Sequence, residues 1–473
     1  MAEASGAVAG GAAGGADAAP AAAARPGVAG GAGGPEAAAG ERLPAALELL
    51  PAGPVAARLA APPSKSVTNR ALVCAALADG GSRLAGALGG DDAQAMAAAL
   101  GELGVPVLDG PAAWTVHGSG GRPRSPRRPL DARLSGTTMR FLAAVATLAP
   151  AGATVGGHPP LLRRPVGPLV TALRALGAEL TDRDGYPPVT AAGGGLDGGE
   201  VRVDASASSQ FASAVLLVAP YARRAVRLRA DGLGAPAYVE LTAALMRDFG
   251  AAVDREDAAV WRVEAGHPYR ARALEVEYDA SAAAHLFALA AATGGSVTVS
   301  NARDGTLQPD AGVPDLLARM GATLARDGTA LTVSGPATLG PVDADLATMP
   351  DQITTVAALA ALARGTSRIR GVAVARGHES DRLAALAAEL GKLGVTVEEL
   401  PDGLVVHGRG AEGLRPARLA THGDHRMAMA LAAVAARVPG LILDDPGCVT
   451  KTYPGFWRDL AAAGLRWRPG RVQ

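Results

Sequence analysis

Two kinds of helix alternate along this chain, and they differ in the spacing of their apolar residues. In the first kind, apolar residues recur every three or four positions, as in Leu169, Leu173 and Leu176, which is typical of a helix with one buried face. In the second kind nearly every position is apolar, which predicts a helix enclosed on all sides. The copies of this second kind read NRALVCAALADG, TMRFLAAVATLAP, SQFASAVLLVAP, AAAHLFALAAATGG, ITTVAALAALARG and RMAMALAAVAARV.

The helices with one apolar face end in a glycine that recurs at even spacing. The shared glycine lies at Gly104, Gly177, Gly250, Gly321, Gly394 and Gly464. Successive intervals run from 70 residues (394 to 464) to 73 residues (104 to 177), which indicates a sixfold internal repeat. Glycine is favoured where a helix stops in the left-handed conformation, and β-like runs follow each copy. We therefore predict a unit of buried helix, strand, exposed helix, strand and strand, repeated six times.

Six units of about 72 residues exceed what one core usually encloses, because domains mostly stay below roughly 250 residues. We expect an α/β fold of two domains with three units each, with buried helices inside and strands outside. The boundary should fall near Tyr278. The first domain would span 63–277, and the second would combine 44–62 with 278–473, the strand in 44–62 pairing into that set.

Residues 1–43 are almost all Ala, Gly and Pro, and we expect them to form a disordered tail. This segment lacks the basic start and continuous apolar core of a signal peptide, and the Arg- and Ser-rich character of a transit peptide.

Composition excludes several classes of protein. The 473 residues are 49% hydrophobic, but no apolar run is long enough to span a membrane without interruption. Basic and acidic residues number 45 each and aromatic residues make up 3%, so neither a nucleic-acid nor a membrane partner is expected. The two cysteines, Cys74 and Cys448, offer no disulfide framework. We expect a cytoplasmic monomer.

Charged and hydroxyl side chains gather immediately before the buried helices. The clusters are Lys65, Ser66 and Arg70; Ser135, Gly136, Thr137, Thr138 and Arg140; Ser208, Ser209 and Gln210; Asp279 and Ser281; Asp351 and Gln352; Asp424, His425 and Arg426. A helix N-terminus carries partial positive charge and free N–H groups, so it favours an anion. If the helices of each domain run parallel, their starts would enclose a cleft for a small ligand that carries several negative charges, such as phosphate.

Nearby loops supply further candidates. They are Arg376, His378, Glu379, Asp381, Arg382 and Lys451. Asp351 and Glu379 are the candidates for proton transfer, whereas Asp279, Asp381 and Asp424 occupy positions suited to helix caps or ion pairs. The histidines share no metal-ligand spacing, so we predict neither a metal nor another cofactor.

Seven segments, in their order and spacing, resemble the motifs of the 3-phosphoshikimate 1-carboxyvinyltransferase family, also called 5-enolpyruvylshikimate-3-phosphate (EPSP) synthases. They read PSKSVTNRAL, SGTTMRFLAA, DASASSQFASA, MPDQITTVAALA, GHESDRLAAL, GDHRMAMA and KTYPGFW. The resemblance covers about residue 44 to the end. It implies an inside-out α/β prism of two domains, each of three βαβαββ units. It also implies transfer of the enolpyruvyl group of phosphoenolpyruvate to the 5-hydroxyl of shikimate 3-phosphate, with release of phosphate, in aromatic amino-acid and chorismate biosynthesis.

The resemblance also implies roles for individual residues. Asp351 would accept the 5-hydroxyl proton, Glu379 would handle the proton on the methylene carbon, and Lys65 would contact both substrates. The residues implied for shikimate 3-phosphate are Lys65, Ser66, Arg70, Ser208, Ser209, Gln210, Tyr238, Asp351 and His378. Those implied for phosphoenolpyruvate are Lys65, Gly136, Thr137, Gln210, Arg382, Arg426 and Lys451. Because Gly136 leaves room in that pocket, we expect glyphosate to compete with phosphoenolpyruvate.

Four positions depart from the family pattern. Leu134 stands where asparagine is frequent, His378 where lysine is common, and Ala235 where a serine is usual. Pro160 aligns with a family arginine, so that Arg163 or Arg164 would have to reach in from a shifted loop.

Two alternatives remain. The sister family, which transfers enolpyruvyl to UDP-N-acetylglucosamine, has Lys-Asn where this chain has Lys65-Ser66, and a cysteine in the loop that reads GGHPPLLRRP here. The second alternative is a non-catalytic relative that binds a phosphorylated metabolite. Such a binding protein would not need both Asp351 and Glu379.

Overall fold

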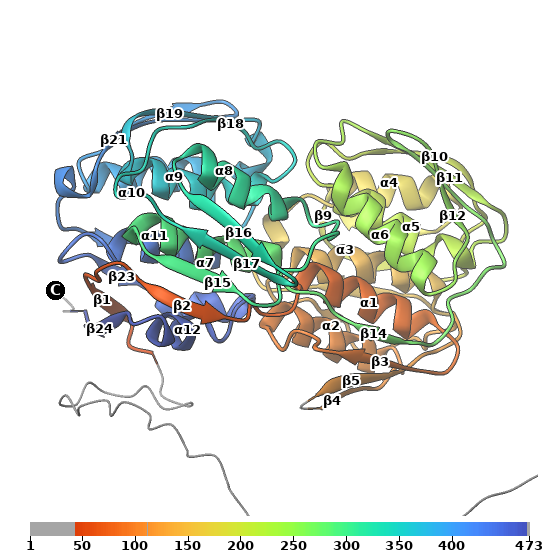
Figure 1. Cartoon of the computed structure of the whole chain (residues 1–473). Helices are drawn as coiled ribbons and strands as arrows, with labels where there is room; N and C mark the ends of the chain where they lie inside the picture. The colour runs from red at the N-terminus through yellow and green to blue at the C-terminus, as the bar shows by residue number, and fades with distance from the viewer. Residues whose placement is uncertain (1–42, 111, 471–473) are drawn as a thin grey trace, which may run out of the picture. The chain divides into compact units, whose positions relative to one another are not determined.

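The computed structural model describes residues 43–110 and 112–470 (Figure 1). The expected disordered tail therefore lies outside the described residues, apart from Leu43. Within the described chain we find no helix whose length and apolar character would let it span a bilayer.

Six four-stranded sheets and twelve α-helices make up the described fold, two helices to each sheet. The first three sheets have the strand orders β14-β3-β5-β4, β6-β7-β9-β8 and β10-β11-β13-β12. Their strands are β3 (Gly81–Ala85), β4 (Val107–Asp109), β5 (Ala113–His117), β6 (Leu130–Asp131), β7 (Ala153–Gly156), β8 (Leu180–Arg183), β9 (Tyr186–Ala191), β10 (Gly199–Asp204), β11 (Val226–Asp231), β12 (Val253–Asp257), β13 (Val260–Val263) and β14 (Ala273–Glu275). Their helices are α1 (Lys65–Leu77), α2 (Asp91–Glu102), α3 (Gly136–Val145), α4 (Gly167–Ala175), α5 (Gln210–Val218) and α6 (Pro236–Asp248).

The other three sheets have the orders β16-β17-β15-β2, β18-β19-β21-β20 and β22-β23-β1-β24. Their strands are β1 (Ala46–Leu50), β2 (Ala56–Leu59), β15 (Ser296–Val299), β16 (Thr323–Asp327), β17 (Ala330–Ser334), β18 (Asp343–Asp345), β19 (Arg364–Arg370), β20 (Thr396–Leu400), β21 (Gly403–Arg409), β22 (Arg418–Leu419), β23 (Ile442–Asp444) and β24 (Arg466–Pro469). Their helices are α7 (Ala280–Thr293), α8 (Val313–Arg319), α9 (Ile353–Leu362), α10 (Arg382–Lys392), α11 (His425–Ala435) and α12 (Phe456–Ala462).

The predicted repeat is confirmed, with one strand per unit missed. In each sheet one edge strand runs parallel to its neighbour, and the remaining pairs are antiparallel. This parallel edge strand is absent from the unit predicted from the spacing, whereas the βαβαββ unit that the resemblance implies includes it. The edge strands β6 and β22 have two residues each, too few to show an alternating pattern. Two others, β2 and β14, come from distant parts of the sequence.

Buried side chains form two large hydrophobic clusters. One contains α1, α3 and α5 and runs from Ala71 to Tyr269, and the other joins residues 47–61 to residues 278–465. The helices α7, α9 and α11 belong to the second cluster, and α9 is buried at every residue. Figure 1 shows the sheets outside these helices. The two clusters support the predicted division into two domains, which stays a proposal.

The six repeated glycines end the second helix of each unit. All have positive φ, between +79° and +106°. Such angles are costly for residues with a Cβ, so glycine lets the chain turn directly from helix into strand.

Gly391, inside α10, and Gly394, two residues beyond its end, provide a matched test of this cost. Gly394 has φ +87°, and an added Cβ would meet only the ordinary contact of Arg415 Nε at 3.5 Å, so Gly394→Ala should lower the free energy of unfolding by about 1–2 kcal/mol. Gly391 lies inside the helix with nothing within 4 Å of its Cβ position, so Gly391→Ala should raise that free energy by about 0.5–1 kcal/mol. Urea unfolding of both variants checks this. If both substitutions changed the free energy of unfolding in the same direction, the conformational explanation would be refuted.

Candidate active site

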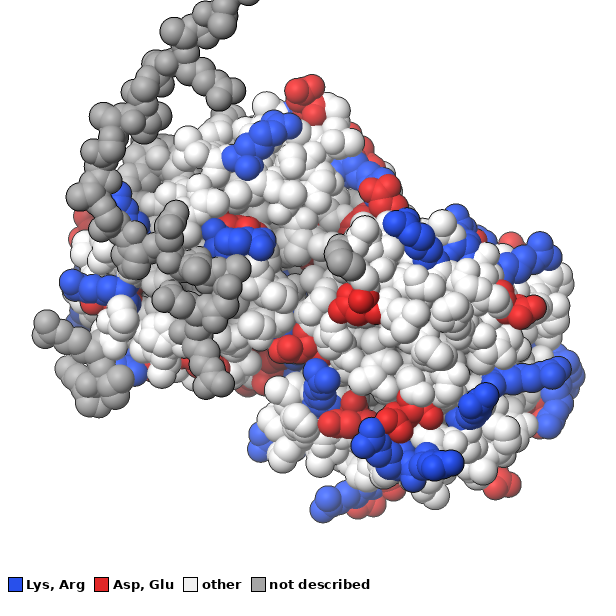
Figure 2. Space-filling view, turned by 90° about the horizontal axis from the view of Figure 1, so that it is seen from below, with Lys and Arg blue, Asp and Glu red and all other residues white. Residues whose placement is uncertain are grey.

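The basic and acidic side chains on the face shown in Figure 2 are interspersed rather than segregated. A site for anions must therefore be built locally, from particular side chains and helix ends.

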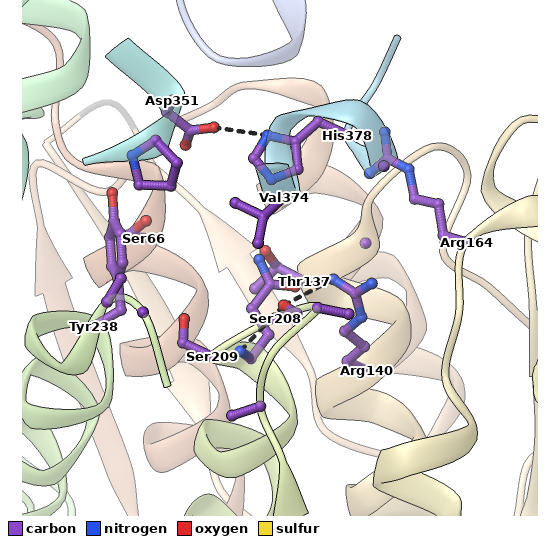
Figure 3. A pocket seen from close by; sticks show the side chains of 18 of the residues that line it. Ser66, Thr137, Arg140, Arg164, Ser208, Ser209, Tyr238, Asp351, Val374 and His378 are labelled. Atoms are coloured by element: carbon purple, nitrogen blue, oxygen red, sulfur yellow. Dashed lines mark hydrogen bonds and ion pairs between the residues drawn. The ribbon is translucent and has the colours of Figure 1, made fainter. Parts of the chain in front are cut away.

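A pocket of about 470 Å³ lies where the starts of five buried helices meet (Figure 3). The lining residues at these starts are Lys65, Ser66 and Arg70 from α1; Gly136, Thr137 and Arg140 from α3; Ser208, Ser209 and Gln210 around the start of α5; Pro350 and Asp351 before α9; and His425 and Arg426 from α11. The start of the sixth, α7, does not line the pocket. Its Asp279 instead accepts a hydrogen bond from the backbone N–H of Lys65 at 3.0 Å.

Side-chain caps define several of these helix starts. The Ser64 hydroxyl accepts from Val67 N at 3.3 Å at the start of α1, so Ser64 rather than Ser66 is the cap. Ser135 caps α3 in the same way. The expected capping carboxylates are confirmed, since Asp279 caps α7, Asp381 caps α10 and Asp424 caps α11.

One buried arginine holds three carboxylates together. Arg382 has no exposed surface, and its guanidinium lies 2.6 Å from Asp351 Oδ1, 3.0 Å from Glu379 Oε2 and 2.8 Å from Asp424 Oδ2. Arg382 was expected to bind phosphoenolpyruvate, but it stands behind Asp351 and Glu379 and does not itself line the pocket.

Asp351 is surrounded by two arginines and a histidine. Besides Arg382, Arg426 Nη2 lies 3.1 Å from its Oδ2 and His378 Nδ1 lies 3.2 Å from its Oδ1. Burial alone would raise the pKa of Asp351, but the charges of Arg426 and Arg382 outweigh it and hold this pKa well below its ordinary value. The carboxylate is thus ionised at neutral pH and able to accept a proton.

Glu379 is held in the same way on the other side of Arg382. Lys451 Nζ lies 2.7 Å and Arg164 Nη2 3.4 Å from its Oε1. Against the opposing effect of burial, Lys451, Arg164 and Arg382 keep the pKa of Glu379 well below its ordinary value. Glu379 in turn raises the pKa of Lys451 despite burial, so the ammonium group stays charged.

Two arginines stiffen the opposite wall. Arg140 donates to Gln210 Oε1 at 2.7 Å and to Ser208 Oγ at 3.3 Å, with its guanidinium 4.9 Å from the centre of the Phe211 ring. Burial, with Arg164 nearby, lowers the pKa of Arg140 to about 9, which still leaves it charged at neutral pH. Arg70 donates to Thr242 Oγ1 at 2.7 Å.

The structure brings most of the predicted residues to one pocket. All nine residues implied for shikimate 3-phosphate line it, as do Gly136, Thr137 and Arg426. Lys451 lies outside the lining but contacts Glu379 and, at 3.4 Å, the backbone oxygen of Leu134. Of the two candidates for the shifted arginine, Arg164 lines the pocket and Arg163 does not.

Asp92 is not among the residues predicted from the sequence, but it lines the pocket, and its Oδ2 lies 3.7 Å from Lys65 Nζ. It stands at the start of α2, and the only signal was a pair of acidic residues after two glycines. Among the described residues, no group of three or more His, Cys, Asp or Glu side chains is placed to hold a metal ion.

Residues 50–460 match the EPSP synthase (3-phosphoshikimate 1-carboxyvinyltransferase) family. The chain belongs to this family. It is 40% identical over 417 residues to the 3-phosphoshikimate 1-carboxyvinyltransferase of Methanoculleus marisnigri, a match that covers 87% of this chain and 98% of that relative. The enzyme of Syntrophobacter fumaroxidans is 42% identical over 412 residues, covering 86% and 97%.

Solved structures agree with this assignment. An EPSP synthase from Acinetobacter baumannii superposes with a TM-score of 0.76 at 26% identity, covering 89% of this chain and 99% of that one. The predicted inside-out α/β fold of the EPSP synthases is therefore confirmed. The family match also sets aside the sister family that acts on UDP-N-acetylglucosamine.

Removing the buried guanidinium tests the charge network. Arg382→Met should lower the free energy of unfolding by about 3–5 kcal/mol at pH 7.5, because it removes the cation that these buried carboxylates share. The low pKa values of Asp351 and Glu379 stabilise the fold above their ordinary values near 4, and this stabilisation is lost as pH falls through the folded pKa values. Because the substitution raises both folded pKa values toward the ordinary range, its destabilisation should be smaller at about pH 3.5 than at pH 7.5.

Urea unfolding at the two pH values measures this difference. Arg376→Met is the control, since Arg376 forms more exposed ion pairs with Asp381 and Glu399 and should cost about 1 kcal/mol or less. A loss for Arg382→Met that does not change with pH would contradict the proposed network.

Proposed function

We propose that this pocket is where the chain carries out the EPSP synthase reaction, in which the enolpyruvyl group of phosphoenolpyruvate passes to the 5-hydroxyl of shikimate 3-phosphate and phosphate is released. The observation that carries the proposal is the pairing of two ionised carboxylates, Asp351 and Glu379, with cations at converging helix starts. Two anionic substrates repel each other in water, so a site that holds them in contact needs this concentration of positive charge.

Shikimate 3-phosphate is assigned to the wall built by α1, α5 and α6. The hydroxyls of Ser66, Ser209 and Tyr238 face the pocket in Figure 3. Ser209 stands at the start of α5 but makes no capping bond, which leaves its hydroxyl available to a phosphate, whereas the Gln210 N–H already donates to Ser208 Oγ at 3.2 Å. Lys65 and Arg70 supply positive charge on the same wall.

Phosphoenolpyruvate is assigned to the space near Gly136 and Thr137. Lys65, Arg164 and Arg426 line this part of the pocket, with Lys451 and Arg382 directly behind Glu379. An added Cβ at Gly136 would lie 3.1 Å from Arg164 Nη1, so glycine keeps this space open. The room at Gly136 also supports the expected competition by glyphosate.

The two carboxylates take different roles in this mechanism. Asp351, ionised beside Arg426, accepts the proton of the 5-hydroxyl. When the phosphate and carboxylate of phosphoenolpyruvate neutralise Lys451 and Arg164, the two largest cationic causes of the low pKa of Glu379 are weakened, so that this pKa rises and the group can take up a proton and deliver it to the methylene carbon. Addition gives a tetrahedral intermediate with a methyl group. Glu379 then takes a proton back from this methyl group, the C–O bond to phosphate breaks, and the proton held by Asp351 leaves with the phosphate.

All the roles assigned above fall on residues of this one chain, and we propose a monomer as the active form. We also propose a cytoplasmic location, where the two free thiols, Cys74 and Cys448, would stay reduced. The remaining alternative is a non-catalytic binder of a phosphorylated metabolite. A phosphate-release assay with both substrates separates these functions, because only the enzyme releases phosphate, and only when shikimate 3-phosphate is present.

Two substitutions test the assigned roles. Asp351→Ala should lower kcat about 10²–10⁴-fold while changing the Kd for shikimate 3-phosphate less than about tenfold, since it removes a general base. Lys65→Met should weaken both kcat and binding, because Lys65 contacts both substrates. Steady-state kinetics and calorimetric titration measure the two effects.

Asp381→Ala is the control, since Asp381 is an exposed helix cap and its loss should cost about 1 kcal/mol of stability with little change in kcat. Collapse of shikimate 3-phosphate binding in Asp351→Ala would show that its role is misassigned.

A further inference from the structure

Two connections carry the described chain between the halves of the fold, and they lie side by side. One joins β2 to α1 and the other joins β14 to α7. Ser64 N donates to the backbone oxygen of Glu277 at 2.8 Å, and Asp279 N donates to that of Pro62 at 2.7 Å. Lys65 is the first residue of α1, so it begins where this pairing ends.

The side chain of Gln308, which is 5% exposed, bonds to both connections. Its Oε1 accepts from the Ser64 hydroxyl at 2.9 Å and from Ala280 N at 3.1 Å. Its Nε2 donates to the backbone oxygen of Tyr278 at 2.7 Å and to Glu277 Oε1 at 3.0 Å. Both ends of the amide are therefore in use, which neither an apolar nor a carboxylate side chain of this size can reproduce.

These bonds act on the residues that set the start of α1. The Ser64 hydroxyl that donates to Gln308 also caps α1 by accepting from Val67 N. Asp279 bridges the two helix starts, with Oδ2 accepting from Lys65 N at 3.0 Å and Oδ1 accepting from Ala282 N at 2.8 Å. Gln308 does not line the pocket, so it cannot act on a ligand directly.

We propose that Gln308 is a positioning residue for the transfer reaction, which fixes the start of α1 against that of α7 and so aims Lys65 at the pocket it shares with Asp351. The proposal rests on the proposed function for the role of Lys65. A shift of about 1 Å in a group that contacts the reacting molecules can cost about 100-fold in rate, so a distant amide can matter to turnover.

Gln308→Leu tests the proposal against a control on the same connection. Asn301 donates to and accepts from the backbone of Ala61 at 2.9 and 3.0 Å, three residues before Ser64, but bonds to neither helix start. Gln308→Leu should lower kcat on the order of 10- to 100-fold at saturating substrates. Asn301→Leu should lower the melting temperature while leaving kcat within about twofold of the wild type. Equal losses of kcat in the two variants would overturn the proposal.

An exchange of side chains tests the same role if Gln308→Leu does not fold. Gln308→Glu places a carboxylate against Glu277, and the further substitution Glu277→Gln restores one donor and one acceptor at this contact. The double variant should regain at least tenfold of the kcat lost in Gln308→Glu. No recovery would contradict a positioning role.

Hydrogen exchange separates this proposal from the proposed function. The Lys65 and Val67 amides should exchange faster in Gln308→Leu than in Asn301→Leu. This difference is expected whether or not the wild type releases phosphate. A wild type that releases no phosphate would refute only the proposed function. Unchanged exchange at these amides would overturn the role of Gln308.

Discussion

The structure depends on holding several cations close together, and their mutual repulsion must be offset by neighbouring carboxylates. Two like charges 4 Å apart repel by about 4 kcal/mol at an effective dielectric constant of 20. Arg382 contacts Asp351, Glu379 and Asp424, and Lys451 contacts Glu379, so these two buried cations are compensated by carboxylates. The same carboxylates serve the proposed chemistry, because their low pKa values change when anionic substrates neutralise the cations.

The fold delivers these charges by repeating one unit. Each buried helix is apolar along most of its length and has polar residues gathered at its start, so burial of the helix places its first N–H groups and the preceding polar residues at one end of the core. Strands exchanged between distant segments tie the units together, as where β14 completes the sheet of β3 and β2 completes that of β15. The paired connections at Ser64 and Asp279 then join α1 to α7, directly beside Lys65.

Much of this could be predicted from the sequence because it depends on local patterns. The even spacing of Gly104 and its counterparts indicated the repeat, and the polar residues before the apolar helices indicated the site. Contacts made only in three dimensions could not be predicted. Arg382 and Glu379 are three residues apart, but its partners Asp351 and Asp424 lie 31 and 42 residues away. Asp92 likewise reaches the pocket through the packing of separate units, and only the structure distinguishes Arg164 from Arg163.

The most direct test is a crystal structure of the chain with shikimate 3-phosphate bound. The phosphate is predicted to lie within hydrogen-bond distance of Ser208 or Ser209 at the start of α5, with the 5-hydroxyl facing Asp351. A ligand bound outside the pocket formed by the helix starts, or one whose phosphate contacts none of them, would contradict the account.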